Sequence, residues 1–433
     1  MEKRSQAYLS EVSDQIRSKE AKDFVSIELD YHIKEAKREW MKKGLTETEA
    51  EKKAVEQMGS PITLGQQLNK LHRPKVDWIT VSLLLTTLAL GFLPLFSIGY
   101  IDNGNFLGHY SQSKVVFVFL GGLTAFGMML INYRNLEKFG WMFYAIGVLI
   151  LLTIRLFSTR IVYGLPVIQL GPITIESMMA LPFFFLAWAS FINNKRLKIW
   201  HFGMLYALSF YLILDLASAS TAYIYIAMVF VMFWWSKFSR KAIITITTLV
   251  ISSFSIIGII IWPLLEIYQK VRLLAFINPE SYPDSAGNMI LFVKKLISQA
   301  GWFGNSIDKQ YFPEAHTNFV FASLTSYYGW LFAMALVLIL SLFIVRIMYI
   351  ARKMPKSYGK LLLIGAVALY SVQMVTNIAM TFGFFPLISM SLPFISYGLM
   401  PILFNSFLIG IVLSVYRRKD LTTSTHKRDL QSL

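Results

Sequence analysis

The sequence predicts an all-α, polytopic membrane protein with about ten transmembrane helices and a small cytoplasmic helical domain at its N-terminus. Of the 433 residues, 55% are hydrophobic and 15% are charged, whereas a soluble chain keeps about 25% charged residues. Apolar runs long enough to cross ~30 Å of hydrocarbon recur from residue 78 onward. The acidic residues are concentrated before these runs, since 13 of the 25 lie between Glu2 and Glu56. Lipid is therefore the expected solvent for most of the chain.

Residues 1–75 are expected to form a three-helix domain. Phe24, Ile27, Tyr31 and Trp40 recur near helical spacing among charged residues. Local signals set its boundaries: Gly44 ends the first helix, Thr46 and Glu49 have capping-box spacing for a second helix to Gly59, and Ser60–Pro61 opens a third that ends near Leu71. Such a domain is either a packed unit with solvated charges or a protein-interaction and signalling module.

The membrane part is expected to cover residues 76–418, followed by a cytoplasmic tail at 419–433. The predicted spans are 78–99, 113–132, 139–157, 177–192, 199–217, 219–235, 242–263, 319–346, 361–383 and 395–416. The fifth and sixth runs are separated only by Ser218–Ser220, so one long bent helix is the alternative there. Counts of nine or eleven spans therefore remain open.

Positive charge orients the predicted spans. Residues 1–76 hold 15 of the 41 Lys and Arg residues, and the remaining 26 exceed the remaining 12 acids by 14. They gather in alternate loops, such as those with Arg134, Lys195, Lys241 and Lys353, which indicates that these loops and both termini are cytoplasmic. The expected location is the bacterial plasma membrane. No soluble segment has a basic patch interleaved with aromatics, so nucleic acid is not an expected partner.

Several classes of chemistry are disfavoured by composition. The chain has no cysteine, which excludes disulfides, Cys-ligated zinc and thiol catalysis. Asp215 is the single acid deep in a predicted span, whereas ion-coupled transporters place several ionisable groups at mid-depth. Asp215 is either a functional group or the partner of a nearby polar group.

The long loop at 264–318 carries the most informative motifs. Loops of this length are usually functional or disordered, and its aromatic residues argue against disorder. The loop contains Tyr268–Arg272, Phe276–Glu280 and Pro313–Thr317 with Phe319, and Leu392–Gly398 and Leu170–Pro172 lie elsewhere in the chain. In this order, these segments resemble the SEDS family, the FtsW/RodA/SpoVE proteins of cell division, elongation and sporulation. The resemblance covers roughly residues 77–418.

The resemblance implies a peptidoglycan glycosyltransferase that polymerises lipid II, an undecaprenyl-linked precursor, on the outer membrane face. A transpeptidase, that is a penicillin-binding protein, is then the expected protein partner. Such chemistry needs a base for the acceptor hydroxyl, which a carboxylate can supply, and cationic help for the leaving pyrophosphate. A divalent cation would serve an active enzyme, although the sequence assigns no metal ligands and no other cofactor.

The chain departs from the family at polar positions. The family's essential Asp after His-Thr is Asn318 here, and an amide cannot take up a proton at neutral pH. The other departures are Ser326–Gly329 for an acidic pair before Gly, Pro166–Val167 for Arg-Trp, Glu176–Met179 for Gln-Pro-Ser-Glu, Ser218 for a mid-span Asp, and Leu399 for a second Gly. Whether the chain is an enzyme is thus left open by its sequence.

Candidate site residues follow from these motifs. Asn318 either binds substrate or caps the next helix, and Glu314, four residues earlier, either replaces the missing base or orders the loop. The candidate substrate-binding residues are Lys270, Arg272, His316, Thr317, Asp215 and Ser396. Lys270 and Arg272 could equally face lipid headgroups, and His316 could make a local hydrogen bond.

Three functional hypotheses follow. The first is a wall-assembly protein that handles lipid II and polymerises glycan strands. The second is a catalytically silent relative that regulates or scaffolds wall synthesis, with residues 1–75 as its input. The third, a lipid-linked precursor flippase, would need a charged path across the membrane, and the predicted spans lack one.

Overall fold

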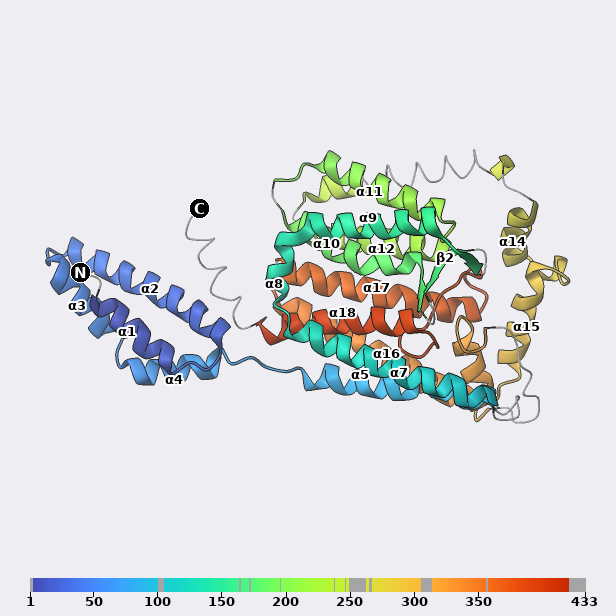
Figure 1. The fold of residues 1–433 in the computed structure, drawn as a ribbon, viewed down its shortest axis with the longest axis horizontal. Helices are drawn as coiled ribbons and strands as arrows, with labels where there is room; N and C mark the ends of the chain where they lie inside the picture. Colours follow the sequence, from blue (N-terminus) through green and yellow to red (C-terminus); the bar gives the residue numbers. More distant parts are fainter. Residues whose placement is uncertain are drawn as a thin grey trace. The chain divides into compact units, whose positions relative to one another are not determined.

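The computed structural model describes residues 3–419, except 100–104, 163–164, 171–172, 195, 237, 246, 249–261, 265–266, 305–313 and 356. The chain divides into two compact units. One comprises Met1–Asp77 with Tyr416–Leu433, and the other comprises Trp78–Val415. Both units are built mainly from helices (Figure 1), so the predicted all-α class is confirmed.

The described part of the N-terminal unit has four helices where the sequence predicted three. They are α1 (Lys3–Asp14), α2 (Lys19–Lys42), α3 (Glu47–Gln57) and α4 (Pro61–Leu71). The additional helix, α1, contributes Tyr8 and Val12 to the core of the unit, and Ile16 follows directly after it. These three side chains stand four residues apart, which places them on one helical face. This spacing was readable in the sequence, but the many polar residues between them obscured it.

The core of this unit is apolar and its helix ends follow local rules. Val25, Leu29 and Ile33 of α2 are buried in one cluster with α1 and α3. Thr46 N–H and Oγ1 both donate to Glu49 Oε2, at 3.2 and 2.6 Å, which confirms the predicted capping box. These bonds lower the pKa of Glu49, because they stabilise its charged form.

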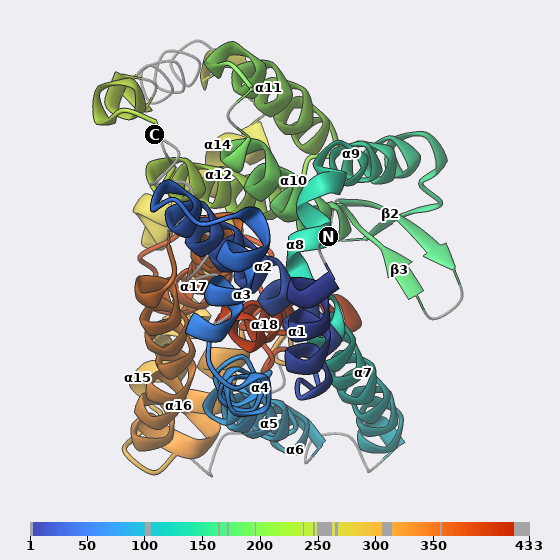
Figure 2. The ribbon, with the colours of Figure 1, turned by 90° about the vertical axis from the view of Figure 1, so that its left-hand side faces the viewer.

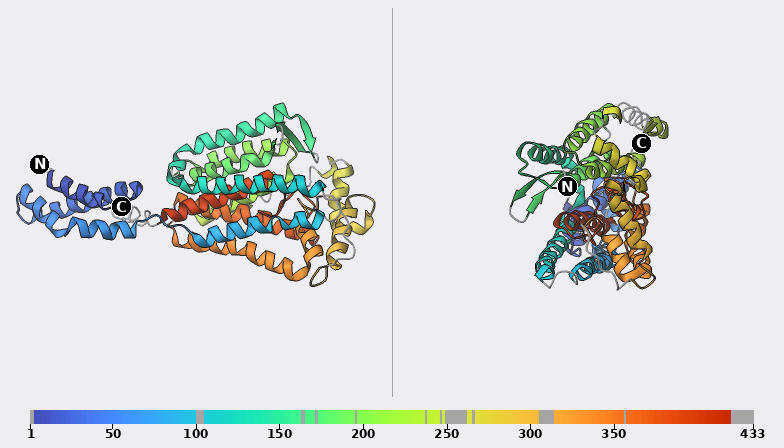
Figure 3. Two further views of the ribbon diagram at one scale, coloured as in Figure 1. Left: turned by 60° about the horizontal axis from the view of Figure 1, so that its bottom comes forward. Right: turned by 90° about the vertical axis from the view of Figure 1, so that its right-hand side faces the viewer.

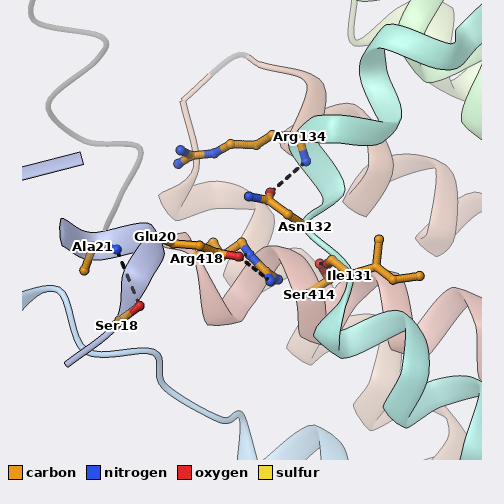
Figure 4. Close-up of polar contacts among 8 residues, drawn as sticks. All are labelled: Ser18, Glu20, Ala21, Ile131, Asn132, Arg134, Ser414 and Arg418. Atoms are coloured by element: carbon orange, nitrogen blue, oxygen red, sulfur yellow. Dashed lines mark hydrogen bonds and ion pairs between the residues drawn. The ribbon is translucent and has the colours of Figure 1, made fainter. Parts of the chain in front are cut away.

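The N-terminal unit also contains an ion pair with one buried partner, Arg418. At the start of α2, Ser18 Oγ accepts a bond from Ala21 N–H (Figure 4). Next to it, the Arg418 guanidinium donates to both carboxylate oxygens of Glu20, at 2.8 and 3.0 Å (Figure 4). Arg418 is only 3% exposed, and bidentate pairing compensates part of the cost of removing its charge from water.

The membrane unit contains the predicted apolar helices. Within the described residues, six segments are long and apolar enough to span a membrane and three shorter apolar helices accompany them. The helices are α5 (Trp78–Leu90), α6 (Leu93–Gly99), α7 (Asn105–Leu130), α8 (Tyr133–Leu136), α9 (Gly140–Phe157), α10 (Leu181–Asn193), α11 (Ile199–Asp215), α12 (Ala219–Trp234), α16 (Val320–Lys353), α17 (Tyr358–Thr381) and α18 (Leu399–Arg417). The predicted span at 242–263 lies largely outside the described residues.

The fifth and sixth predicted spans are separate helices. α11 ends at Asp215 and α12 begins at Ala219, with Ala217 between them at φ 53°. A non-glycine residue with this backbone angle cannot continue an α-helix. The alternative of one bent helix is therefore wrong.

The helices of the membrane unit surround α18. Viewed along the bundle, α5 and α7 lie on one side of α18, and α9 to α12 lie on the other (Figures 1 and 2). Close to the α8 end, Ser414 Oγ donates to Ile131 O at 2.6 Å, and Arg134 N–H donates to Asn132 Oδ1 at 3.1 Å (Figure 4). The first of these bonds ties α18 to the end of α7.

Two short helices close one end of the bundle, which we call the loop end. α14 (Ile267–Ile277) and α15 (Ala286–Ser298), joined by the 3₁₀ turn Pro279–Ser281, lie across the spanning helices there (Figure 3). A small antiparallel sheet follows α9, with strands β1 (Arg160–Val162), β2 (Leu165–Leu170) and β3 (Ile173–Ile175) in the order β1-β2-β3. This sheet was not expected from the sequence.

A glycine latch joins the end of α15 to α16. Gly329, inside α16, has φ 85° and interrupts the helix. At this break Trp330 N–H donates to Gly301 O and Leu331 N–H donates to Trp302 O, at 3.0 and 3.2 Å. A Cβ on Gly329 would stand 2.3 Å from Trp302 O, so only glycine permits the latch.

Candidate functional site

Two segments far apart in sequence meet at the loop end. One is the turn 314–319 directly before α16, and the other is the turn 389–398 directly before α18. Tyr397 N–H donates to His316 O at 2.8 Å, and Ser396 Oγ donates to Thr317 O at 2.7 Å. The two motifs singled out in the sequence therefore form one structural site, which we call the paired turns.

Asn318 faces a carboxylate rather than its own helix. Its Nδ2 donates to Glu314 Oε2 at 2.5 Å and to Ser389 Oγ at 3.1 Å. The N-cap residue of α16 is Phe319, which has no side-chain cap bond. The interpretation of Asn318 as a helix cap is therefore wrong, because its amide is directed across the paired turns.

Glu314 is held in an unusual backbone conformation. Its φ is 61°, a region that costs a non-glycine residue energy unless the surroundings enforce it. Here the Glu314 carbonyl accepts bonds from Thr317 N–H at 3.0 Å and Phe319 N–H at 3.1 Å. Ala315 and Phe319 pack in one cluster with Val293 of α15. The tight turn brings the carboxylate back beside Asn318, which spacing in the sequence alone could not establish.

Asn377 of α17 forms hydrogen bonds to both of the paired turns. Its Nδ2 donates to Asn318 O at 2.8 Å and to Met390 O at 2.7 Å. The side chain is fully buried. Asn377 and Ser389 were not predicted as site residues, because a single amide or hydroxyl in an apolar or loop segment gives no distinctive sequence pattern.

His316 lies among aromatic rings. Its ring stands edge-on to Tyr110 of α7 and to Tyr397, with centroids 5.6 Å away in both cases. Burial and then the positive charge of Lys114 lower the pKa of His316. The imidazole is therefore neutral at pH 7.

Ser396 is part of the framework of the site. Its hydroxyl accepts from Leu392 N–H at 2.8 Å while it donates to Thr317 O. The residue is 0% exposed. Because burial leaves no surface for a ligand, the predicted substrate contact of Ser396 becomes a contact that holds the turns together.

The remaining candidate residues lie elsewhere. Asp215 at the end of α11 pairs with Arg155 of α9, with Oδ2 2.5 Å from Nε. Lys270 of α14 donates to Pro263 O at 3.1 Å. The side chain of Arg272 lies outside the described residues. The contacts of Asp215 and Lys270 are therefore local ones, away from the paired turns.

A second polar cluster includes Ser218, which stands where the family resemblance expects an Asp. Ser218 Oγ donates to Thr221 Oγ1 at 2.8 Å, and Thr221 Oγ1 lies 2.9 Å from Ser177 Oγ. All three hydroxyls belong to buried residues of α12, of the turn before it, or of the 3₁₀ helix η2 (Ser177–Ala180). The three hydroxyls bond to one another, which explains how they are tolerated in the interior.

The paired turns are rich in oxygen atoms but have few side chains of the kinds that usually bind a metal ion. Among the described residues, there is no group of three or more His, Cys, Asp or Glu residues that could hold a metal ion. Mg²⁺, however, is often held by one or two carboxylates together with substrate phosphates. The Glu314 carboxylate fits that mode as a single protein ligand.

The architecture defines a class of protein before any comparison. It is a multi-pass helical membrane protein with a turn-built site of one carboxylate, amides and hydroxyls at the loop end. The FtsW/RodA/SpoVE family, described as "Cell cycle protein", matches residues 77–421. The chain therefore belongs to this family, and the resemblance drawn from its motifs is confirmed.

Individual relatives are similar over part of the sequence. A probable peptidoglycan glycosyltransferase FtsW of Trichlorobacter lovleyi is 32% identical over 165 residues, which are 37% of this chain and 43% of that protein. The peptidoglycan glycosyltransferase MrdB of Escherichia coli is 29% identical over 168 residues, 37% of this chain and 45% of that protein. The matched segments thus span less than half the length of these relatives.

Solved structures share the fold over most of the chain. A chain of a peptidoglycan synthase complex has a TM-score of 0.67 and 24% identity, covering 80% of this chain and 99% of that one. The rod shape determining protein RodA of Thermus thermophilus has a TM-score of 0.58 and 22% identity, with 79% and 97% covered. At these identities the likeness establishes the fold.

Proposed function

We propose that this protein handles an undecaprenyl-linked peptidoglycan precursor at the outer membrane face and extends glycan strands from it. The observation that carries the proposal is the carboxylate of Glu314 at hydrogen-bonding distance from Asn318. Asn318 stands where the family resemblance expects the catalytic acid. The site thus keeps a carboxylate at that place, although it comes from a position four residues earlier in the chain.

In this mechanism Glu314 is the general base for the acceptor sugar hydroxyl. A carboxylate has about four acceptor sites, and among the described residues its side-chain partner is Asn318 through Oε2. Oε1 is then the atom that takes up the proton. The Asn318 amide orients the carboxylate, and Ser389 holds the amide in place.

A divalent cation, if held through the substrate phosphates, would stabilise the charge on the leaving pyrophosphate, while Glu314 acts as the base. The protein partner that suits this activity is a transpeptidase, which would cross-link the strands. A likeness to a chain of a peptidoglycan synthase complex is consistent with such a partner.

A polymerisation assay tests the proposal. Full-length protein, labelled lipid II, Mg²⁺ and a penicillin-binding protein are expected to yield glycan strands. General-base catalysis typically contributes 10²- to 10⁴-fold, so Glu314→Gln should lower the rate by about 10²-fold or more. Ser281→Gln, in the exposed turn between α14 and α15, is the control. Absence of product under conditions in which an active relative polymerises would overturn the proposal.

A second function, a catalytically silent regulator or scaffold, is favoured by Asn318 itself, since its amide cannot accept a proton. In that case Asn318→Asp leaves the wall phenotype unchanged, and deletion of residues 1–75 alters it. Loss of the wall phenotype in Asn318→Ala at normal protein level would contradict the silent role.

The proposal requires the loop end to face outward and both termini to be cytoplasmic. Lys and Arg residues at the opposite end support this, among them Arg134 in α8 and Lys353 at the end of α16. The natural chain has no cysteine, so single cysteines report orientation cleanly. Ser281→Cys should react with an impermeant maleimide in intact cells, and Asn135→Cys should not. The reverse labelling would overturn the orientation.

A further inference from the structure

A lysine buried near the loop end has no role in the mechanism above. Lys114 lies in α7 and is 0% exposed. Its Nζ is 3.0 Å from Ser396 O, 3.3 Å from Ile395 O and 3.4 Å from Phe394 O. Three consecutive carbonyls of the turn 389–398 thus surround one ammonium group.

These three contacts use the full donor capacity of the lysine. An ammonium has three N–H donors and no acceptor. An ionisable group inside a membrane protein needs partners, because desolvation is costly. Among the described residues Lys114 makes no salt bridge, so the carbonyl dipoles are what offsets its burial. Nothing of the ammonium is left to contact a ligand.

The turn that Lys114 holds needs support. Phe394 has φ 63°, a conformation that persists only where the surroundings enforce it. The carbonyl oxygens of residues 394–396 all converge on Lys114 Nζ, so without a cation their partial negative charges would repel one another. Gly91, just after α5, permits the close packing here, because a Cβ on it would stand 2.5 Å from Phe394 O and 3.3 Å from Lys114 Nζ.

The supported turn is connected directly to the candidate catalytic residues. Ser396 donates its hydroxyl to Thr317 O, and Tyr397 donates its N–H to His316 O. Asn318 follows Thr317 and contacts Glu314. A displacement of residues 394–396 would therefore be transmitted to the turn that presents the carboxylate.

We propose that Lys114 is a positioning residue whose ammonium locks the turn 394–396 and thereby holds Glu314 and Asn318 in register. This proposal deepens the proposed function and rests on it for the catalytic consequence. The competing role is direct contact with the substrate pyrophosphate, which complete burial and saturation of the donors argue against.

Hydrogen exchange on the full-length protein in nanodiscs tests the lock without needing turnover. In Lys114→Met, which keeps an unbranched side chain one atom shorter and removes the charge, the amides of Ser396 and Tyr397 are expected to exchange at least about tenfold faster. Amides in the middle of α17 should keep their rates. Gly122→Ala, also in α7 and with nothing within 4 Å of its added Cβ, is the matched control.

A second variant approaches the turn from the other side. Gly91→Ala forces Phe394 O away from Lys114 and should accelerate exchange at the same amides, so the proposal is tested even if Lys114→Met does not fold. Unchanged exchange of Ser396 and Tyr397 in the folded variants would overturn it.

Kinetics then separate positioning from substrate contact. If wild type polymerises lipid II, a positioning role predicts that Lys114→Met lowers kcat and leaves KM within about twofold, because the reacting groups are misplaced. A rise in KM with unchanged loop exchange would identify Lys114 as a substrate contact instead. If wild type makes no polymer, the proposed function fails. The exchange result still shows whether Lys114 holds the turn 394–396 in place.

Discussion

The N-terminal unit and the paired turns are stabilised in opposite ways. In the N-terminal unit, Val25, Leu29 and Ile33 form an apolar core, and ion pairs such as Lys34–Asp30 lie on the surface. At the paired turns the interior is polar, because Lys114, Asn377 and Ser396 are fully buried and bonded to main-chain carbonyls. Burial of apolar surface stabilises the first region, whereas individual hydrogen bonds to main-chain carbonyls stabilise the second.

This difference determines how each region should respond to mutation. Loss of apolar volume is costly but spread over many contacts. Loss of one buried donor leaves a specific acceptor unsatisfied and affects a local segment. Four substitutions or conditions, ordered from the largest expected effect to the smallest, test this contrast.

Ile33→Ala should destabilise the N-terminal unit by about 2–5 kcal/mol, since it removes buried methyl groups and leaves a cavity. Hydrogen exchange of α2 amides in the full-length protein measures the effect. Ile27→Ala, the same change at a residue of α2 that is 59% exposed, is the control. Equal effects of the two substitutions would contradict the assigned core.

Asn377→Ala should destabilise the paired turns by about 1–3 kcal/mol, because the carbonyls of Asn318 and Met390 lose their buried donor. Faster exchange confined to residues 314–319 and 389–398 is the expected signature. Val375→Ala on the same helix, where the side chain is 58% exposed, should change little. If loosening extends through all of α17, the directed-bond description is wrong.

Acidification should loosen the paired turns. The folded state holds the pKa of His316 below its usual 6.5, so the unfolded state binds more protons below about pH 6.5. Stability of the turns therefore falls as the pH drops from 7.5 to 5.5. Exchange rates corrected for intrinsic pH dependence measure this loss, and His316→Phe should abolish it. A pH response that persists in His316→Phe would assign it to another group.

Asp30→Ala should cost at most about 0.5 kcal/mol. It removes an exposed pair with Lys34, with 2.8 Å between Lys34 Nζ and Asp30 Oδ2, and such i,i+4 pairs contribute little in water. The thermal unfolding midpoint of the N-terminal unit should hardly move. A loss as large as that of Ile33→Ala would mean that the pair is more than a surface contact.

The fold was predictable where one physical rule acts over many residues. The apolar length of the spans and the capping signals at Gly44, Thr46 and Ser60 located their helices within a few residues. The helix α1 was missed, although Tyr8, Val12 and Ile16 show its spacing. The β1-β2-β3 sheet was missed because its strands are as short as three residues and carry no clear alternation.

The site was predictable only in part, because its contacts join residues distant in sequence. The motif positions 314–318 and 392–398 were identified, yet their pairing and the supporting contacts from Lys114 and Asn377 depend on tertiary structure. Local rules allowed Asn318 to be a helix cap. A helix cap would use the Asn318 carbonyl oxygen as an acceptor, whereas the structure has its Nδ2 donating to the Glu314 carboxylate, and such charge-assisted bonds are strong.

The glycine latch at Gly329 separates a part of the membrane unit that should tolerate insertions from a part that should not. Residues 301–302 are fastened to α16 before the chain reaches the paired turns. Insertions around Asp284, which lies in an exposed stretch between α14 and α15, would be absorbed upstream of that fastening. An epitope or fluorescent tag placed there should leave the geometry around Glu314 intact, whereas any side chain at residue 329 would not.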